Sequence, residues 1–241
     1  MRGLATRSRR EVALTPEQLT IVWQSASLLL DYPSEELLEH VALVRSATPA
    51  LPDRLGDLLR GFADHLERTP LGELQAEYVE TFDSRRRCNL FLTYFAHGDT
   101  RKRGMALLRF KQAYLQAGFE ITDEELPDHL CVVLEFAATG DQDTGRQLML
   151  DHRAGLELLR MSLRDLDSPW AVVVEAVTAT LPPLGGDEVE AVRRLAAEGP
   201  PEEEVGLTPY ATPGFDPGPA VPGSPIPLPM PSFPAHPTGA R

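Results

Sequence analysis

The sequence lacks the short motifs that mark nucleotide binding, metal binding and nucleophilic catalysis. It contains neither G-x-x-x-x-G-K-S/T nor G-x-G-x-x-G, so no phosphate-binding loop is indicated. Its six histidines form no H-E-x-x-H pattern and no pair three or four residues apart, and there is no G-x-S-x-G nucleophile elbow. These absences make catalysis the minority hypothesis and favour a protein that works by binding.

Cysteines and long apolar runs are also scarce. The two cysteines, Cys88 and Cys131, lie far apart and outside any C-x-x-C spacing, so we expect a reducing compartment and no disulfide or zinc framework. No stretch approaches the roughly 18 consecutive apolar residues of a membrane-spanning helix. The arginines of residues 1–14 are not followed by an apolar run of signal-peptide length. We therefore expect a soluble, cytoplasmic protein with no stable membrane insertion.

Beyond the N-terminal arginines, positive charge is scarce except in one segment. The chain has 23 Lys and Arg against 36 Asp and Glu, a net charge of -13, which opposes binding to nucleic acid. Residues 83–111 reverse this balance, with eight Lys or Arg against two Asp. Between the two basic clusters of this segment lie the apolar side chains of Leu90, Phe91, Leu92, Tyr94 and Phe95. Apolar and cationic groups in one segment indicate a recognition surface rather than a catalytic pocket.

Composition divides the chain into three parts. Of the 22 prolines, 13 lie in residues 199–241. Because proline blocks helix and donates no backbone hydrogen bond, we expect this segment to be a disordered Pro/Gly-rich tail. Residues 1–14 are expected to be a flexible basic N-terminus. Residues 15–198 remain as a single globular domain.

The domain has the pattern of an all-α fold with about eight or nine helices. Thr15, Pro16 and Gln18 combine an N-cap, a proline at the first helical position and a capping-box glutamine. Ser34, Thr69-Pro70 and Ser168-Pro169 give similar start signals. Apolar spacing predicts further helices that begin near residue 51 and near residue 99, and over residues 122–138, 143–166, 168–181 and 187–197.

Local sequence also predicts where some of these helices end and which face is apolar. The helix that begins near Asp99 or Thr100 should end at Gly118, a glycine suited to a left-handed C-cap. Its expected apolar residues are Leu107, Leu108, Tyr114 and Leu115. The valines at 172–174 have strand propensity, but the preceding cap and the segment length favour a buried helix. No strand-turn-strand signal such as Asn-Gly occurs.

Pro127, Asp128 and His129 come nearest to a metal-dependent hydrolase motif. That chemistry needs further His and Asp ligands at helical spacing, and these are absent. We interpret Asp128 as a first-turn helix carboxylate, favoured by the helix dipole. An enzyme with a non-local site around Asp128 and His129 remains a minor hypothesis.

Four segments carry a resemblance to a known family: YVETFDSRRRC, LTYFAHGDTRKRGMALLRFK, AGFE and ELPDHLCVVLEFAA. They closely resemble the NarJ family, the delta-subunit chaperones that assemble respiratory nitrate reductase. The likeness runs roughly from Leu19 to Leu181. The wider TorD/DmsD-like superfamily of molybdoenzyme chaperones shares a Tyr-x-x-x-Phe helix, matched by Tyr78 and Phe82, and a Pro-x-x-His-like helix start, matched loosely at residues 127–129.

The resemblance implies an all-helical fold of the molybdoenzyme-chaperone type and a system-specific chaperone, not an enzyme. Such a chaperone binds the apo catalytic alpha subunit of nitrate reductase, including its N-terminal segment, and keeps it competent for molybdenum cofactor insertion before the subunit docks at the membrane. It is not part of the mature enzyme and binds no cofactor stably. Molybdenum cofactor delivery proteins are further expected partners. The proline-rich tail has no counterpart in the superfamily core.

A client helix laid in a groove needs an apolar floor and charged rims. We expect the floor to comprise Tyr78, Phe82, Leu90, Leu92 and Tyr94, and the rims Glu80, Asp83, Asp99, Lys102 and Arg103. The competing interpretation is that the aromatic residues belong to the core, where large apolar side chains are usually found. Residues 85–87 either form a solvated turn or pair with Glu73, Glu77 and Glu80. The acidity of the rest of the chain would steer a basic peptide toward the protein.

The alternative from another functional class is a small all-α regulator that binds nucleic acid through the basic 85–111 patch. Arg101, Lys102 and Arg103, at an expected helix start, would contact phosphates. The net charge of -13 opposes this hypothesis.

Overall fold

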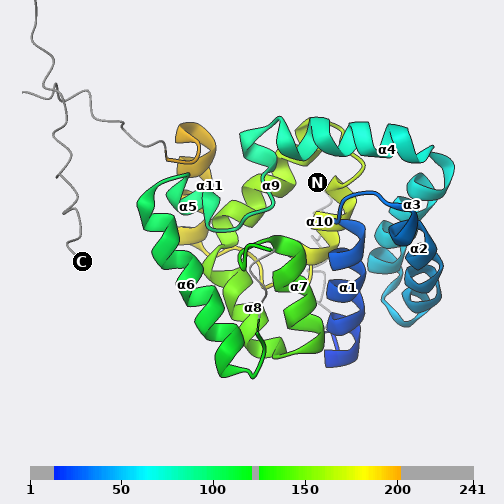
Figure 1. Ribbon diagram of the computed structural model, residues 1–241, viewed down its shortest axis with the longest axis horizontal. Helices are drawn as coiled ribbons and strands as arrows, with labels where there is room; N and C mark the ends of the chain where they lie inside the picture. Colours follow the sequence, from blue (N-terminus) through cyan, green and yellow to red (C-terminus); the bar gives the residue numbers. More distant parts are fainter. Residues whose placement is uncertain (1–13, 121–124, 202–241) are drawn as a thin grey trace, which may run out of the picture. The chain divides into compact units, whose positions relative to one another are not determined.

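The computed structural model describes residues 14–120 and 125–201, and within these ranges the protein is built from helices (Figure 1). This confirms the predicted all-α class. The expected flexible N-terminus, apart from Leu14, and residues 202–241 of the expected tail lie outside the described residues. The helices are α1 Pro16–Leu29, α2 Glu35–Ala47, α3 Asp53–Arg68, α4 Leu71–Tyr78, α5 Tyr94–His97, α6 Arg101–Gln116, α7 Leu130–Thr139, α8 Gln142–Asp151, α9 Arg153–Asp165, α10 Ala171–Thr178 and α11 Gly186–Glu198.

Several helix ends follow directly from the local sequence. The Thr15 hydroxyl accepts a hydrogen bond from Gln18 N at 3.2 Å, and the Gln18 side chain accepts one from Thr15 N at 3.1 Å, which confirms the capping box of α1. Ser34 caps α2 by accepting from Leu37 N at 3.1 Å. After α6 the chain passes through Gly118 with φ of +83°, the left-handed conformation predicted for that glycine.

Two predicted caps are wrong. Ser168 does not cap α10, because the helix begins only at Ala171 and the Ser168 hydroxyl is buried with no hydrogen-bond partner. Thr69 does not cap α4, because it belongs to the end of α3, where Thr69 N donates a hydrogen bond to His65 O. The Thr69 hydroxyl lies 3.4 Å from His65 Nδ1. Tertiary packing and the preceding helix therefore decide these two positions.

Two predicted helices differ in extent, and the described ranges contain more α-helices than the expected eight or nine. The segment over 143–166 is two helices, because α8 ends where His152 Nδ1 meets Leu148 O at 2.9 Å and the chain turns into α9. The helix predicted over 122–138 begins only at Leu130. Just before it, Asp128 O accepts from Leu92 N at 3.0 Å and Leu130 N donates to Leu90 O at 2.8 Å, so this backbone pairs with an extended segment instead of forming a helical turn.

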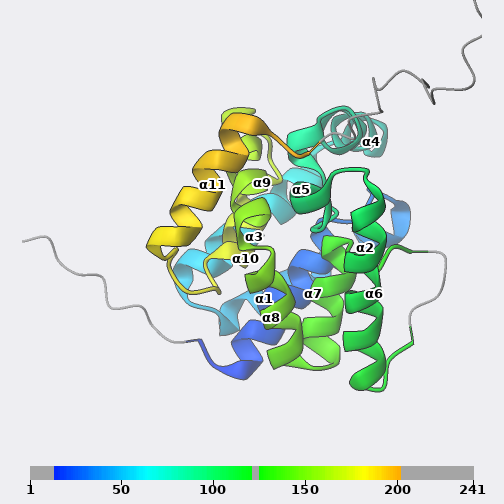
Figure 2. The same cartoon turned by 90° about the vertical axis from the view of Figure 1, so that its left-hand side faces the viewer.

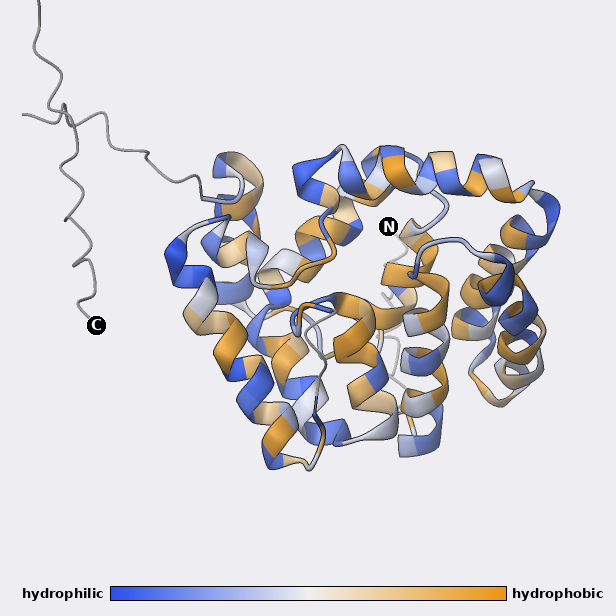
Figure 3. Cartoon of the chain, viewed as in Figure 1, coloured by the Kyte–Doolittle hydropathy of each residue, from blue (hydrophilic) through white to orange (hydrophobic). Residues whose placement is uncertain are grey.

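The core lies where α1, α7, α9 and α10 meet, beside α3 (Figure 2). Trp170, just before α10, contacts the rings of Phe62, Tyr78 and Phe82 at centroid distances of 5.5 to 5.7 Å. The valine run at 172–174 is helical as predicted and contributes two fully buried valines. Figure 3 shows that apolar residues dominate α7, which packs between α1 and α8. This helix forms the floor of the site described next.

Candidate binding groove along helix α7

The five residues predicted as an apolar floor are buried in the protein. Tyr78, Phe82, Leu90, Leu92 and Tyr94 are between 1% and 7% exposed. Tyr78 packs on Phe82 with ring centroids 4.7 Å apart, and its hydroxyl donates to Leu30 O at 3.1 Å. These side chains serve the core in this structure, as the competing interpretation supposed, and their contact with a client remains a prediction.

The predicted rim residues are mostly exposed, and several are paired. Glu80 pairs with Arg85 at 3.0 Å, one of the pairings considered from sequence, whereas Glu77 pairs with His65. Asp83 and Lys102 lie at the surface. Arg103 reaches Asp99 at 3.4 Å, but its side chain is only 15% exposed and turns inward. Of the three cations proposed to contact phosphates, Arg103 is therefore engaged within the protein.

The extended segment around Phe91 creates one end of a groove. Because side chains alternate along extended backbone, Leu90 and Leu92 point into the core and Phe91 points outward. Phe91 forms an isolated antiparallel bridge with His129, and the two rings lie 5.0 Å apart. The alternation was visible in the sequence, but Phe91 was not among the predicted site residues.

The groove has two adjoining sections along α7, with volumes of about 380 and about 320 Å³. Glu125, Val132 and Glu135 line both sections, so we treat them as one surface, the α7 groove. Its apolar floor consists of Leu28, Phe91, Leu126, Val132, Phe119 and Phe136. Its carboxylates are Asp31, Glu120, Glu125 and Glu135.

The α7 groove is negatively charged. Among the described residues that line it, none is Lys or Arg. Burial lowers the pKa of His129 despite the nearby acids, so its ring is neutral at pH 7 and does not offset their charge. Burial also raises the pKa of the Cys131 thiol, which keeps it protonated and unreactive. An apolar floor with carboxylates at its edges suits a ligand that is apolar on one side and cationic on the other.

Asp128 lies buried beneath the groove, where it connects two of the segments that form it. Its side chain is 0% exposed, and Oδ2 accepts hydrogen bonds from Thr93 N at 3.1 Å and from the Thr93 hydroxyl. Arg103 Nε donates to Thr93 Oγ1 at 3.2 Å, Arg103 Nη2 lies 3.5 Å from Asp128 Oδ2, and the guanidinium stands 5.1 Å from the centre of the Phe91 ring. The interpretation of Asp128 as a first-turn helix carboxylate is therefore wrong. It ties the segment before α7 to the segment that carries Phe91.

The same geometry argues against a reactive centre at Asp128 and His129. A carboxylate without solvent exposure cannot meet a substrate in this conformation. Across residues 14–120 and 125–201, no group of three or more His, Cys, Asp or Glu side chains is placed to hold a metal ion. Nor does that part of the chain contain a helix long and apolar enough to cross a membrane. The arrangement can bind a ligand but shows no group positioned to transform one.

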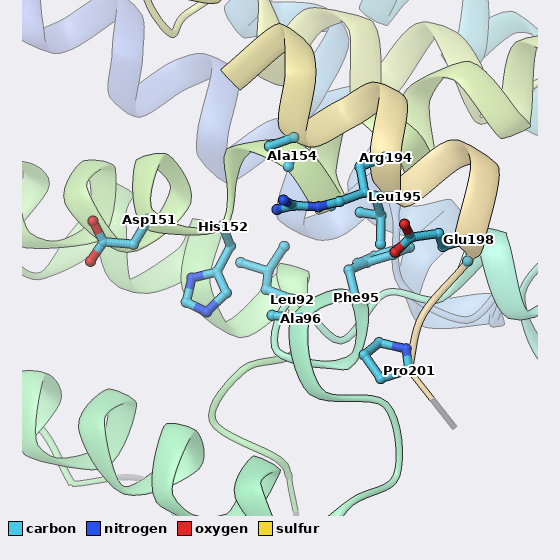
Figure 4. A pocket seen from close by; sticks show the side chains of 13 residues that line it. Leu92, Phe95, Ala96, Asp151, His152, Ala154, Arg194, Leu195, Glu198 and Pro201 are labelled. Atoms are coloured by element: carbon cyan, nitrogen blue, oxygen red, sulfur yellow. The ribbon is translucent and has the colours of Figure 1, made fainter. Parts of the chain in front are cut away.

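A separate pocket of about 300 Å³ lies between α5, α9 and α11 (Figure 4). Phe95 and Leu195 contribute apolar surface, while Arg194 and Glu198 bring charges of both signs. Of the predicted site residues it contains Leu92 alone, at 1% exposure. This mixed character gives less indication of a ligand than the α7 groove does.

Comparison with known proteins identifies the family. The model of the nitrate reductase delta subunit family matches residues 48–175, which include α6, α7 and the segment carrying Phe91. The chain belongs to the nitrate reductase delta subunit family. It is 32% identical over 167 residues to the "Probable nitrate reductase molybdenum cofactor assembly chaperone NarJ" of Bacillus subtilis, with 68% of this chain and 90% of that protein covered. The NarJ protein of Escherichia coli, 33% identical over 152 residues, is likewise named as a nitrate reductase molybdenum cofactor assembly chaperone.

Two further similarities are more partial. The nitrate reductase-like protein NarX of Mycobacterium tuberculosis is 40% identical over 167 residues. The match covers 66% of this chain but only 24% of NarX, so the chain spans about a quarter of that relative's length. Among solved structures, a protein of Archaeoglobus fulgidus described as a redox enzyme maturation protein aligns with a TM-score of 0.48 and 23% identity, covering 75% of this chain and 97% of that one.

Proposed function

We propose that this chain is a cytoplasmic, system-specific chaperone of respiratory nitrate reductase that binds the apo alpha subunit through the α7 groove. The N-terminal segment of the alpha subunit lies in the groove as an amphipathic helix, with its apolar side on the floor and its cationic side toward the carboxylates. Residues 15–198 form the chaperone domain. The observation that carries this proposal is the acidic edge around an apolar floor in a member of this family.

The floor supplies the affinity. Phe91 and Val132 are partly exposed and Leu126 is 42% exposed, so a ligand in the groove can contact all three. Covering such surface is the usual driving force when an amphipathic helix docks in a groove. A client segment that becomes ordered on binding loses conformational entropy, so the resulting affinity is moderate. Moderate affinity suits a partner that must later be released.

The carboxylates supply selectivity and orientation. Asp31 lies in the turn after α1, Glu125 in the segment before α7 and Glu135 on α7 itself, so the three carboxylates surround the floor from different segments. Together with the net charge of -13, these three carboxylates attract a basic segment over several ångströms and repel acidic ones. Exposed pairs of this kind are screened by salt, so binding weakens as ionic strength rises.

The chaperone acts by covering client surface and not by turnover. While the N-terminal segment occupies the groove, the alpha subunit stays open to molybdenum cofactor insertion, with cofactor delivery proteins as further partners. Once the loaded subunit folds, its N-terminal segment is less accessible and the chaperone is released, so it is absent from the mature enzyme. The chaperone itself retains no cofactor.

Calorimetric titration with a peptide copying the N-terminus of the alpha subunit tests this proposal. We expect binding that weakens with salt and that falls about threefold to tenfold in Glu135→Lys, because the substitution replaces an attractive rim charge by a repulsive one. The matched control is Glu39→Lys, which makes the same change at an exposed position of α2. Equal losses in both variants, or no binding by the unsubstituted protein, would contradict the proposal.

A further inference from the structure

Helix α6 has two apolar faces, and only one of them is covered. Ala106, Phe110 and Tyr114 are buried against the body, at 8%, 1% and 2% exposure. On the opposite side, Met105, Leu108 and Leu115 are 67%, 49% and 58% exposed. Spacings of three and seven residues bring these three side chains onto one line of the helix. We call this line the outer face of α6. Leu108 and Leu115, two of the apolar residues expected on this helix, lie on this outer face.

The outer face is more than scattered surface hydrophobicity. Of the ten large apolar side chains that are exposed in the described ranges, four lie within residues 105–119, the fourth being Phe119 at 41%. Single exposed apolar residues are ordinary, but a contiguous group indicates an interaction surface. Figures 1 and 2 both place α6 at an outer edge of the helical body, where a partner can reach it.

The charges of α6 define the partner. The helix contains Arg101, Lys102, Arg103, Arg109 and Lys111 and no acidic residue. Of these, Arg101, Lys102 and Arg109 are exposed. A complementary surface must therefore be concave, apolar at its centre and acidic at its edge. The α7 groove of this same protein has these properties.

The two surfaces adjoin. Phe119 follows Leu115 by four residues and lines the α7 groove, where its ring lies 5.7 Å from that of Phe136. Tyr114, on the covered side of α6, contacts Phe136 at 4.5 Å. A cationic apolar ridge beside an acidic apolar groove is self-complementary, since a two-fold rotation places each ridge opposite the other copy's groove.

We propose that the free chaperone forms a homodimer in which the outer face of α6 of each copy occupies the α7 groove of the other. Both exposed apolar surfaces are then covered at once. Because the same groove is proposed for the client, client binding and dimerisation exclude each other, and a client segment converts the dimer to monomer. Only this competition rests on the proposed function. The dimer itself rests on the shapes and charges of the two surfaces.

Sedimentation velocity of the full chain over about a hundredfold range of concentration tests the dimer, since self-association must depend on concentration. We expect the mass to rise from 26.5 kDa toward twice that value, with weaker association at high salt. Leu108→Glu, which puts a carboxylate opposite an acidic groove, should raise the dimer dissociation constant by at least about tenfold. Leu43→Glu is the matched control, an equally drastic change at a leucine of α2 that is 61% exposed.

Three results would overturn the dimer. The protein could stay monomeric at every concentration, or Leu43→Glu could weaken association as much as Leu108→Glu does. The third is a monomer that binds anionic lipid vesicles through the outer face of α6. If circular dichroism shows that Leu108→Glu loses helix, Arg109→Glu replaces it, because the Arg109 side chain is exposed. A monomer that still binds the client peptide refutes the dimer and leaves the proposed function standing. A dimer that persists unchanged at high peptide concentration, with no peptide bound, refutes the proposed function instead.

Discussion

Replacing Asp128 tests whether the groove depends on the buried contacts behind it. In Asp128→Ala, Thr93 N and the Thr93 hydroxyl lose a charged acceptor in a site that water does not reach. Hydrogen bonds to charged groups contribute about 1.5 to 3 kcal/mol each, and breaking a buried ion pair costs about 3 to 5 kcal/mol. Arg103 keeps Asp99 at 3.4 Å and is 15% exposed, which relieves part of that cost.

We therefore expect Asp128→Ala to lower the free energy of unfolding by about 3 kcal/mol. For a domain of this size that corresponds to a fall in Tm of about 6 to 12 °C. Asp128→Asn should cost less, about 1 to 2 kcal/mol, because its amide oxygen still accepts from Thr93 while its NH2 group occupies the place of Oδ1, which has no partner.

Urea unfolding followed by circular dichroism measures these differences. A double-mutant cycle with Thr93→Val should give a coupling energy of about 1 to 2 kcal/mol, because the two side chains are in direct contact. A loss below about 1 kcal/mol in Asp128→Ala, or a coupling near zero, would refute the reasoning that these contacts anchor the groove.

Two further predictions concern packing and pH. A Cβ at Gly145 would lie 2.5 Å from the Ala137 Cβ, so Gly145→Val should push α7 and α8 apart and lower the free energy of unfolding by about 3 kcal/mol. Gly61 lies in the middle of α3 with no atom near an added Cβ, so Gly61→Ala should raise the free energy of unfolding by about 0.5 to 1 kcal/mol. Similar urea midpoints for both variants would refute this. Burial lowers the pKa of His129 in the folded protein. Below about pH 6.5 the unfolded chain therefore binds a proton at this histidine more readily than the folded protein does. The contribution of neutral His129 to the free energy of unfolding is complete above that pH and is lost as the pH falls below it. His129→Gln should make the urea midpoint fall less steeply between neutral and acidic pH. His97, whose pKa is also lowered, causes the part of the decline that remains. An unchanged pH profile in His129→Gln would contradict the role given to His129.

Part of the site could be predicted from the sequence, and the part that could not is non-local. The sequence predicted a binding surface with an apolar floor and charged edges, and the structure contains a groove with both features. The residues that form it were not identified, because Leu28, Phe91, Phe119 and Val132 come from four separate segments. The predicted floor residues Leu90 and Leu92 flank Phe91, and a one-residue alternation decides which of them faces outward.

The sequence by itself determined the fold class, the capping of α1 and α2 and the turn at Gly118, because each depends on residues within about four positions of one another. Only the tertiary structure decided which apolar side chains stay uncovered and what Asp128 does. Those outcomes depend on contacts between distant segments, such as the hydrogen bond of Ser27 to Cys131 O, which joins α1 to α7 across 104 residues. Periodicity marks a helix face as apolar, but only the neighbour across the gap determines whether that face is buried.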